Sequence, residues 1–404
     1  MIPTKRTHPT HPISTSGRRA PRRVAVALAA ATVVAAGCTE QGATTTGADT
    51  ATVDVTSSDG ACELSTTEIE SGNLVFDVTN DGAEVTEFYL LAEDGLRIVG
   101  EVEDIGPGVS RRLVVRAEPG EYVTACDPGM AGEGLRAGFT VVDGGDGSLE
   151  PAADDELLAT AVEQYAAYVD HQTEQLVAET AEFASAYLDG DDETARARYP
   201  EARTHWERIE PGAESFGDLD PRLDLREADL EPGQAWTGWH RIEKDLWPPS
   251  DVGYEAATDA ERAELADLLV ADTDELAQRV GELELRPDQL GNGAKELLDE
   301  VATGKVTGEE EIWSGTDLWD FQANVDGARV AFEVLAPVLA ERDPELAEVL
   351  EERFADVQAL LDEHRDGDGF VAYGELSTDE VKALSDAVSA LGEPLSRLTA
   401  AVLL

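Results

Sequence analysis

The sequence predicts two structured domains in one chain, a small β-sandwich followed by a larger all-α domain. Between residues 51 and 143, short apolar segments such as Leu74 to Val78 alternate with polar residues and are separated by turn residues. Beyond residue 154 the apolar residues recur every three or four positions, which is the spacing of amphipathic helices. We therefore place the sandwich at 51–143, a Gly/Asp-rich linker at 144–153 and the helical domain at 154–404.

The first 38 residues have the composition of an export signal. They contain six Lys or Arg and no Asp or Glu, and the last basic pair precedes an apolar run from Val24 to Ala36. This run is too short to span a membrane. It ends at Gly37-Cys38, which favours a lipoprotein signal with Cys38 as the lipid-carrying first residue of the mature chain. An ordinary signal with an incidental cysteine is the alternative, and two arginine pairs leave Sec and twin-arginine export open.

A flexible tether is expected at 39–50, because this segment is rich in Thr, Gly and Ala. The β-sandwich that follows holds the two remaining cysteines, Cys62 and Cys126. In an exported domain they most simply form a disulfide. The alternative is a metal site that adds Glu87 and Met130 to the two cysteines. A type 1 copper centre is not expected, because it needs two His ligands and no His lies between 51 and 143.

The helical domain is divided by clear start and stop signals. Asp189-Gly190-Asp191 ends a first long helix, and Glu210-Pro211 ends a second. A loop then runs to about residue 235, before a short helix that Pro248-Pro249 stops. Further helices are expected at about 257–284, 286–302, 316–340, 343–365 and 377–401. About 250 residues of helix are enough for two packed bundles.

Two acidic motifs at helical spacing are the candidate metal ligands. His240 and Glu243 stand three residues apart, so a helix places them on one face, and Glu207 and Glu210 repeat the spacing. Inward-facing pairs of this kind supply metal ligands in helical bundles. The alternative for His240 is a purely structural contact with Glu243 at the surface or at a helix cap. The segment from Thr316 to Gly327 also mixes carboxylates with aromatic residues, and capping by Ser314 or Thr316 explains part of that pattern.

The net charge excludes some partners. It is −55 for the whole chain, and removal of the basic leader makes it six units more negative. Such a chain repels nucleic acid and anionic lipid and suits cations, although an acidic surface also simply keeps an exported protein soluble. With 42% hydrophobic residues the chain can still build packed cores.

Several sequence segments together resemble the EfeO family of the EfeUOB iron-uptake system, and the resemblance covers nearly all of the chain from residue 51. The resemblance rests on five segments: Pro119 to Tyr122, His205 to Pro211, Phe216 to Leu219, Gly238 to Lys244, and Thr316 to Gly327. It implies a cupredoxin-like β-sandwich followed by an imelysin-like double four-helix bundle, with a metal site in the helical domain.

The resemblance also implies which residues bind the metal. The family's HxxE motif falls on His240 and Glu243, and its other acidic ligands fall on Glu207, Glu210, Asp224 and Glu310. Gly315 stands where the family often has a histidine. Carboxylates and imidazole suit Fe3+ or Fe2+, and the same ligands would also bind Zn or Cu.

The implied function is non-catalytic. The leader predicts an exported, lipid-anchored cell-surface or periplasmic protein. The resemblance implies that it captures iron and delivers it to an EfeU-type membrane permease, alongside an EfeB-type haem peroxidase. A metal-dependent peptidase of the imelysin class is one alternative, but the sequence lacks the His-Glu-x-x-His motif of zinc peptidases. A redox protein that oxidises ferrous iron is the other, and it would need a redox metal at Cys62 and Cys126.

Overall fold

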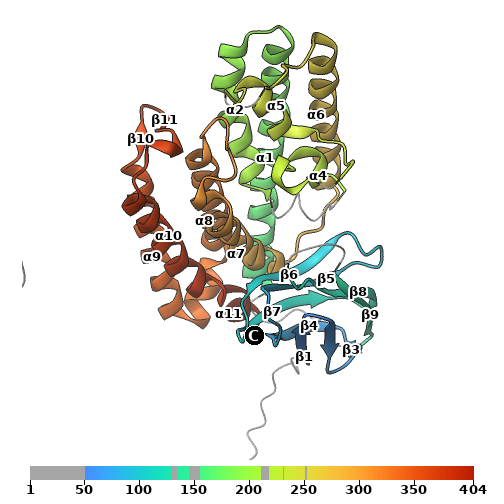
Figure 1. Ribbon diagram of the computed structural model, residues 1–404. Coiled ribbons are helices and arrows are strands. Elements are labelled where there is room, and N and C mark those ends of the chain that lie inside the picture. The colour runs from blue at the N-terminus through green and yellow to red at the C-terminus, as the bar shows by residue number, and fades with distance from the viewer. Residues whose placement is uncertain (1–50, 130–133, 145–154, 211–217, 231, 251–252) are drawn as a thin grey trace, which may run out of the picture. The chain divides into compact units, whose positions relative to one another are not determined.

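The computed structural model describes residues 51–129, 134–144, 155–210, 218–230, 232–250 and 253–404 (Figure 1). Cys38, the tether and Met130 lie outside these residues. A β-sandwich comes first and a helical domain follows, which confirms the predicted fold class. None of the described helices combines the length and the hydropathy needed to span a bilayer.

The sandwich consists of two sheets. The four-stranded sheet has the order β2 (Ala61–Leu64), β1 (Ala51–Ser58), β4 (Gly72–Asn80), β7 (Ser110–Ala117). The five-stranded sheet has the order β3 (Glu68–Glu70), β9 (Leu135–Val142), β8 (Gly120–Cys126), β5 (Thr86–Leu91), β6 (Ile98–Ile105). The pairs β1–β4 and β3–β9 are parallel, and the other neighbours are antiparallel. Phe76, Phe88 and Phe139 fill the space between the sheets with ring centroids 5.2 and 5.5 Å apart.

A disulfide links the two sheets. Cys62 on β2 and Cys126 on β8 are joined with an S–S distance of 2.10 Å across a sequence separation of 64 residues. Closing a loop of that length stabilises the fold by about 4 kcal/mol in the chain-entropy description. A disulfide sulfur is not a thiolate ligand, so the alternative metal site is not formed in this oxidised state. Glu87 is buried nearby on β5 and accepts a hydrogen bond from the Tyr89 hydroxyl.

The helical domain contains two groups of packed helices. The first comprises α1 (Asp155–Leu188), α2 (Asp192–Glu207), α5 (Gly238–Leu246) and α6 (Asp259–Val280), with the short α4 (Asp220–Leu223) beside α5 and α6. The second comprises α7 (Pro287–Thr303), α8 (Asp317–Arg342), α9 (Pro344–Asp362) and α10 (Thr378–Leu395), followed by α11 (Leu398–Leu403). Helices α1 and α8 pack against each other and join the two groups.

Short elements connect the helices. Three are 3-10 turns, at Glu227–Asp229, Lys305–Thr307 and Tyr373–Glu375, and a small hairpin pairs β10 (Arg365–Asp366) with β11 (Gly369–Phe370). Capping boxes start α6 at Thr258 and α10 at Ser377. In contrast, Thr316 makes no side-chain hydrogen bond to the start of α8, whereas the Ser314 hydroxyl accepts from the Thr316 backbone N–H at 3.3 Å.

The described residues from 51 onward belong to one unit in which the sandwich contacts the helices. Asn292 of α7 donates a hydrogen bond to the Val114 carbonyl of β7 at 3.0 Å, and the Arg116 backbone donates to Asp288 at the same distance. Val75 and Val114 belong to the apolar core of the helical domain rather than to that of the sandwich. Strands β6 and β7 therefore face α7.

Candidate metal centre

Helix α5 carries the first pair of candidate ligands into the interior. Its nine residues are mostly buried, because Trp239, Ile242 and Leu246 pack into the helical core. The i, i+3 spacing puts His240 and Glu243 on the buried side as well, with exposed fractions of 1% and 0%. A surface contact for His240 is therefore excluded.

The imidazole of His240 lies among four carboxylates. Its Nε2 is 3.3 Å from Asp224 and 3.4 Å from Glu310, while its Nδ1 is 3.5 Å from Glu243 and 3.7 Å from Glu311. Both ring nitrogens are buried, and neither has a hydrogen-bond partner of good geometry among the described residues. Either ring nitrogen of this buried imidazole could therefore bind a metal ion held by the neighbouring carboxylates.

Glu243 is held in a fixed orientation. Its Oε1 accepts hydrogen bonds from the backbone N–H groups of Trp313 at 3.0 Å and Ser314 at 2.7 Å. Its Oε2 is buried without a hydrogen bond and points toward His240. The backbone thus orients one carboxylate oxygen and leaves the other available as a ligand.

The second pair of candidate ligands lies at the end of α2. Glu207 and Glu210 both contact the ammonium group of Lys305, at 2.9 and 3.0 Å, and both accept from the amide of Asn324 on α8, at 3.2 and 3.0 Å. Asp224 follows α4 and accepts from the indole N–H of Trp206 at 2.8 Å. The exposed fractions of Glu207 and Glu210 are 0% and 5%.

All six ligands predicted from the sequence lie in one cluster. Among the described residues, three groups of potential ligand atoms fall within 4.8 Å of one another, and these groups share His240 and Asp224. The groups are Asp224-His240-Glu310, His240-Glu243-Glu311 and Glu207-Glu210-Asp224. The three sets therefore form one continuous centre.

Sequence reasoning missed the residues that complete the centre. Glu311 is fully buried and accepts from the hydroxyls of Tyr199 at 3.1 Å and Ser314 at 2.9 Å. Asp320 is fully buried, neither of its oxygens has a hydrogen-bond partner among the described residues, and its Oδ2 lies 3.5 Å from Nε of Arg203. The only sequence signal for these two was the unusual acidity of the segment before and inside α8.

Two buried cations were also missed. Arg203 is fully buried on α2 and forms ion pairs with Glu207 and Asp224, while its Nε lies 2.7 Å from Glu311. Lys305 is fully buried in the 3-10 turn after α7. The i, i+4 spacing of Arg203 and Glu207 was a usable signal, but such spacing is far more common on exposed helix faces.

The carboxylates outnumber the cations. Burial raises the pKa of Glu210, Glu311 and Asp320 well above the usual values. Burial acts in the same direction on Glu310, but nearby positive charge, first of Lys305, outweighs it and lowers the pKa. Burial alone would lower the pKa of His240, whereas the negative charge of Asp224 raises it to about 10. A bound cation would relieve this excess of negative charge.

Gly238 fixes the start of α5 and hence the position of His240. Its φ is +80°, and a Cβ there would lie 2.0 Å from the Leu223 carbonyl oxygen, next to Asp224. We expect Gly238→Ala to shift α5 away from Asp224 and to lower metal affinity at least about tenfold. A tenfold change in affinity corresponds to a loss of about 1.4 kcal/mol of binding free energy. Gly190→Ala is the control in a metal titration, because Gly190 has a φ of +70° but open space around it. Equal affinities in both variants would contradict the prediction.

Comparisons with known proteins agree with this architecture. Residues 161–398 match the family model of imelysin, and residues 25–141 match that of the cupredoxin-like domain. The chain is 37% identical over 349 residues to the iron uptake system component EfeO of Escherichia coli O157:H7, covering 85% of this chain and 89% of that protein. The chain belongs to the EfeO family.

Another EfeO relative, from Escherichia coli K12, is 36% identical over the same length. Among solved structures, a putative iron-regulated protein A precursor from Parabacteroides distasonis matches with a TM-score of 0.49 and 14% identity, covering 63% of this chain and 97% of that one. The EfeO relatives are named as components of iron uptake rather than as enzymes. In this EfeO-family chain the cluster holds one histidine, whereas a zinc peptidase of the His-Glu-x-x-His type needs two.

Proposed function

We propose that this protein is the extracytoplasmic iron-binding component of an EfeUOB-type uptake system and that iron binds among His240, Glu243, Glu207, Glu210, Asp224 and Glu310. The observation that carries the proposal is the buried His240, whose two nitrogens lack hydrogen bonds and face carboxylates on both sides. Oxygen ligands with one imidazole suit ferric and ferrous ions. The EfeO relatives supply the link to iron uptake.

Delivery to a membrane permease completes the proposed role. An EfeU-type permease would receive the iron, and an EfeB-type haem peroxidase would act in the same system. Iron is the cargo here, so the site must both bind and release it. Arg203 and Lys305 fit that requirement, because they compensate the carboxylates when no iron is bound.

Titration of the purified protein with iron tests the proposal. Ferric citrate and anaerobic ferrous iron are compared with zinc and copper by calorimetry and thermal melting. Iron at 100 times its Kd should stabilise the native state by about 2.7 kcal/mol. If neither form of iron binds or raises the melting temperature, the protein is not an iron carrier. Stronger stabilisation by zinc or copper than by iron would identify a different cargo.

Location is tested separately. If Cys38 carries a lipid, the protein expressed with its own leader should fractionate with the membrane, and Cys38→Ala should move it to the soluble fraction. The expectation rests on the acid-free basic leader that ends at Gly37-Cys38. A protein that stays in the membrane fraction after Cys38→Ala would need a different anchor.

A further inference from the structure

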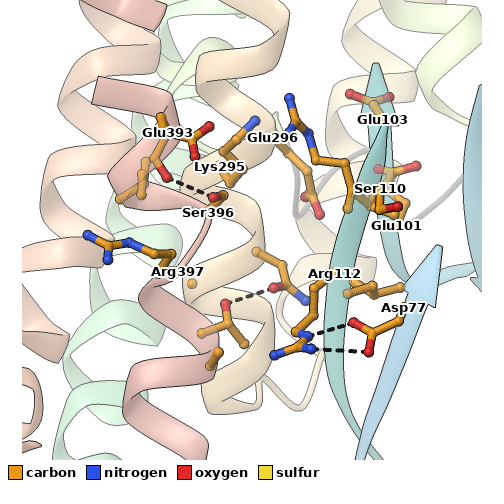
Figure 2. A pocket seen from close by; sticks show the side chains of 18 of the residues that line it. Asp77, Glu101, Glu103, Ser110, Arg112, Lys295, Glu296, Glu393, Ser396 and Arg397 are labelled. Atoms are coloured by element: carbon orange, nitrogen blue, oxygen red, sulfur yellow. Dashed lines mark hydrogen bonds and ion pairs between the residues drawn. The ribbon is translucent and has the colours of Figure 1, made fainter. Parts of the chain in front are cut away.

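A second acidic region lies away from the His240 centre, in a pocket between the sandwich and α7. The pocket has a volume of about 850 Å3 and is lined by β6, β7, α7 and the C-terminal helices. Figure 2 shows Glu101 and Glu103 on one strand, with Lys295 and Glu296 on the helix opposite. The two domains thus each contribute carboxylates to one cavity.

Three of these carboxylates have no protein partner. Glu101, Glu103 and Glu296 make no hydrogen bond or ion pair with any residue that the structure describes, and Glu101 is only 8% exposed. Of the basic groups that line the pocket, Lys295 pairs with Asp299 and Arg112 pairs with Asp77, and none forms an ion pair with these three carboxylates among the described residues. Glu101 is the buried member of the three, and ionising a carboxyl group there is costly without a nearby positive charge, so a cation is a suitable ligand.

The electrostatics point in the same direction. Burial raises the pKa of Glu101 and Glu103 well above the usual value, and the other carboxylates, Glu296 and Glu101 respectively, add to the shift. Burial raises the pKa of Glu296 to about 8. Protons therefore compete with a cation for these carboxylates, and cation binding should strengthen as the pH rises.

The geometry limits how a cation could bind. Among the described residues, all three groups whose potential ligand atoms lie within 4.8 Å of one another are at the His240 centre. The pocket carboxylates are therefore too far apart for three of them to coordinate one ion directly. A cation that keeps its water shell spans larger gaps, because each bound water donates a hydrogen bond to a carboxylate. A cavity of about 850 Å3 has room for such a hydrated ion.

We propose that Glu101, Glu103 and Glu296 bind a hydrated divalent cation in this pocket, between the sandwich and α7. The cation is held through its water shell and does not replace the iron of the His240 centre. It neutralises carboxylates from both domains and so stabilises their contact. The site is independent of the function proposed above.

Cobalt(III) hexaammine is a suitable probe, because its six ammonia ligands do not exchange and it binds carboxylates only through N–H donors. It should bind the purified protein in calorimetry, and crystals soaked with it should show cobalt anomalous signal between β6 and α7. Glu101→Gln with Glu296→Gln should weaken this binding at least about tenfold, and millimolar magnesium should displace the probe from the wild type. The His240 centre, which coordinates metal directly, should not take this probe.

A double variant on the surface controls for general attraction to an acidic protein. Glu348→Gln with Glu352→Gln makes the same two substitutions at exposed positions of α9 and should bind the probe like the wild type. Equal weakening in both double variants, cobalt signal only outside the pocket, or failure of magnesium to compete would each overturn the proposal. The melting temperature without cation shows whether the variants fold, and it should not fall, because glutamine removes repulsion between carboxylates.

Discussion

Glu243→Ala should weaken iron binding on the order of 100-fold, or about 2.7 kcal/mol, while helix content stays unchanged. One oxygen of the Glu243 carboxylate points toward His240, and the other accepts hydrogen bonds from two backbone N–H groups. Removing it takes away a negatively charged ligand from the centre. The cores of both helix groups do not depend on this side chain, because they consist of apolar residues from other positions.

Two further variants separate ligand loss from structural damage. Glu243→Gln keeps an oxygen that can accept from Trp313 and Ser314 but removes the negative charge. It should lower iron affinity nearly as much as alanine while keeping the wild-type melting temperature. His240→Ala should also weaken iron binding and shift the preference toward harder ions, since only oxygen ligands remain. Glu348→Ala on the exposed face of α9 is the control.

Calorimetric titration and far-ultraviolet circular dichroism measure both properties. The assignment of the centre is wrong if the Glu243 and His240 variants bind iron like the wild type. It is also wrong if Glu348→Ala weakens binding to the same extent, because that outcome would indicate general attraction of iron to an acidic surface.

The two inward-facing pairs could be predicted because helical spacing alone puts the members of each pair on one face. His240 with Glu243, and Glu207 with Glu210, are separated by three residues, and a chain with six His makes a buried His informative. Asp224 and Glu310 came only from the family resemblance, since loop residues have no periodicity that reveals their direction. The structure brings all of these side chains together.

The compensating cations could not be predicted for a physical reason. Arg203 and Lys305 are residue types that usually lie at the surface, and their burial depends on contacts with carboxylates from α2, α4 and the segment before α8. The Lys305–Glu210 contact joins residues 95 positions apart, so no local pattern reports it. The i, i+4 spacing of Arg203 and Glu207 was the one local signal, and it does not distinguish a buried pair from an exposed one. The acids at the start of α8 were similarly ambiguous, because first-turn acids also stabilise helices without facing inward.

Arg203→Met should destabilise the iron-free protein by about 3–5 kcal/mol, because it leaves buried carboxylates uncompensated. Arg203 is fully buried and pairs with Glu207 and Asp224, with Glu311 also in contact. The melting temperature should fall on the order of 10 °C. Arg353→Met is the control, because Arg353 is exposed and its 2.7 Å pair with Asp356 is worth less than about 1 kcal/mol.

Iron should reverse most of that loss. A bound ion supplies the positive charge that the arginine supplied, so the difference in melting temperature between wild type and Arg203→Met should shrink as iron is added. By the thermodynamic cycle, the variant's native state must then bind iron more tightly by the factor that corresponds to the recovered free energy. If Arg203 instead orients the ligands or only fills space, iron will stabilise the variant no more than the wild type, and its affinity will be equal or lower. Thermal melting at several iron concentrations, with calorimetry on both proteins, decides between the two roles.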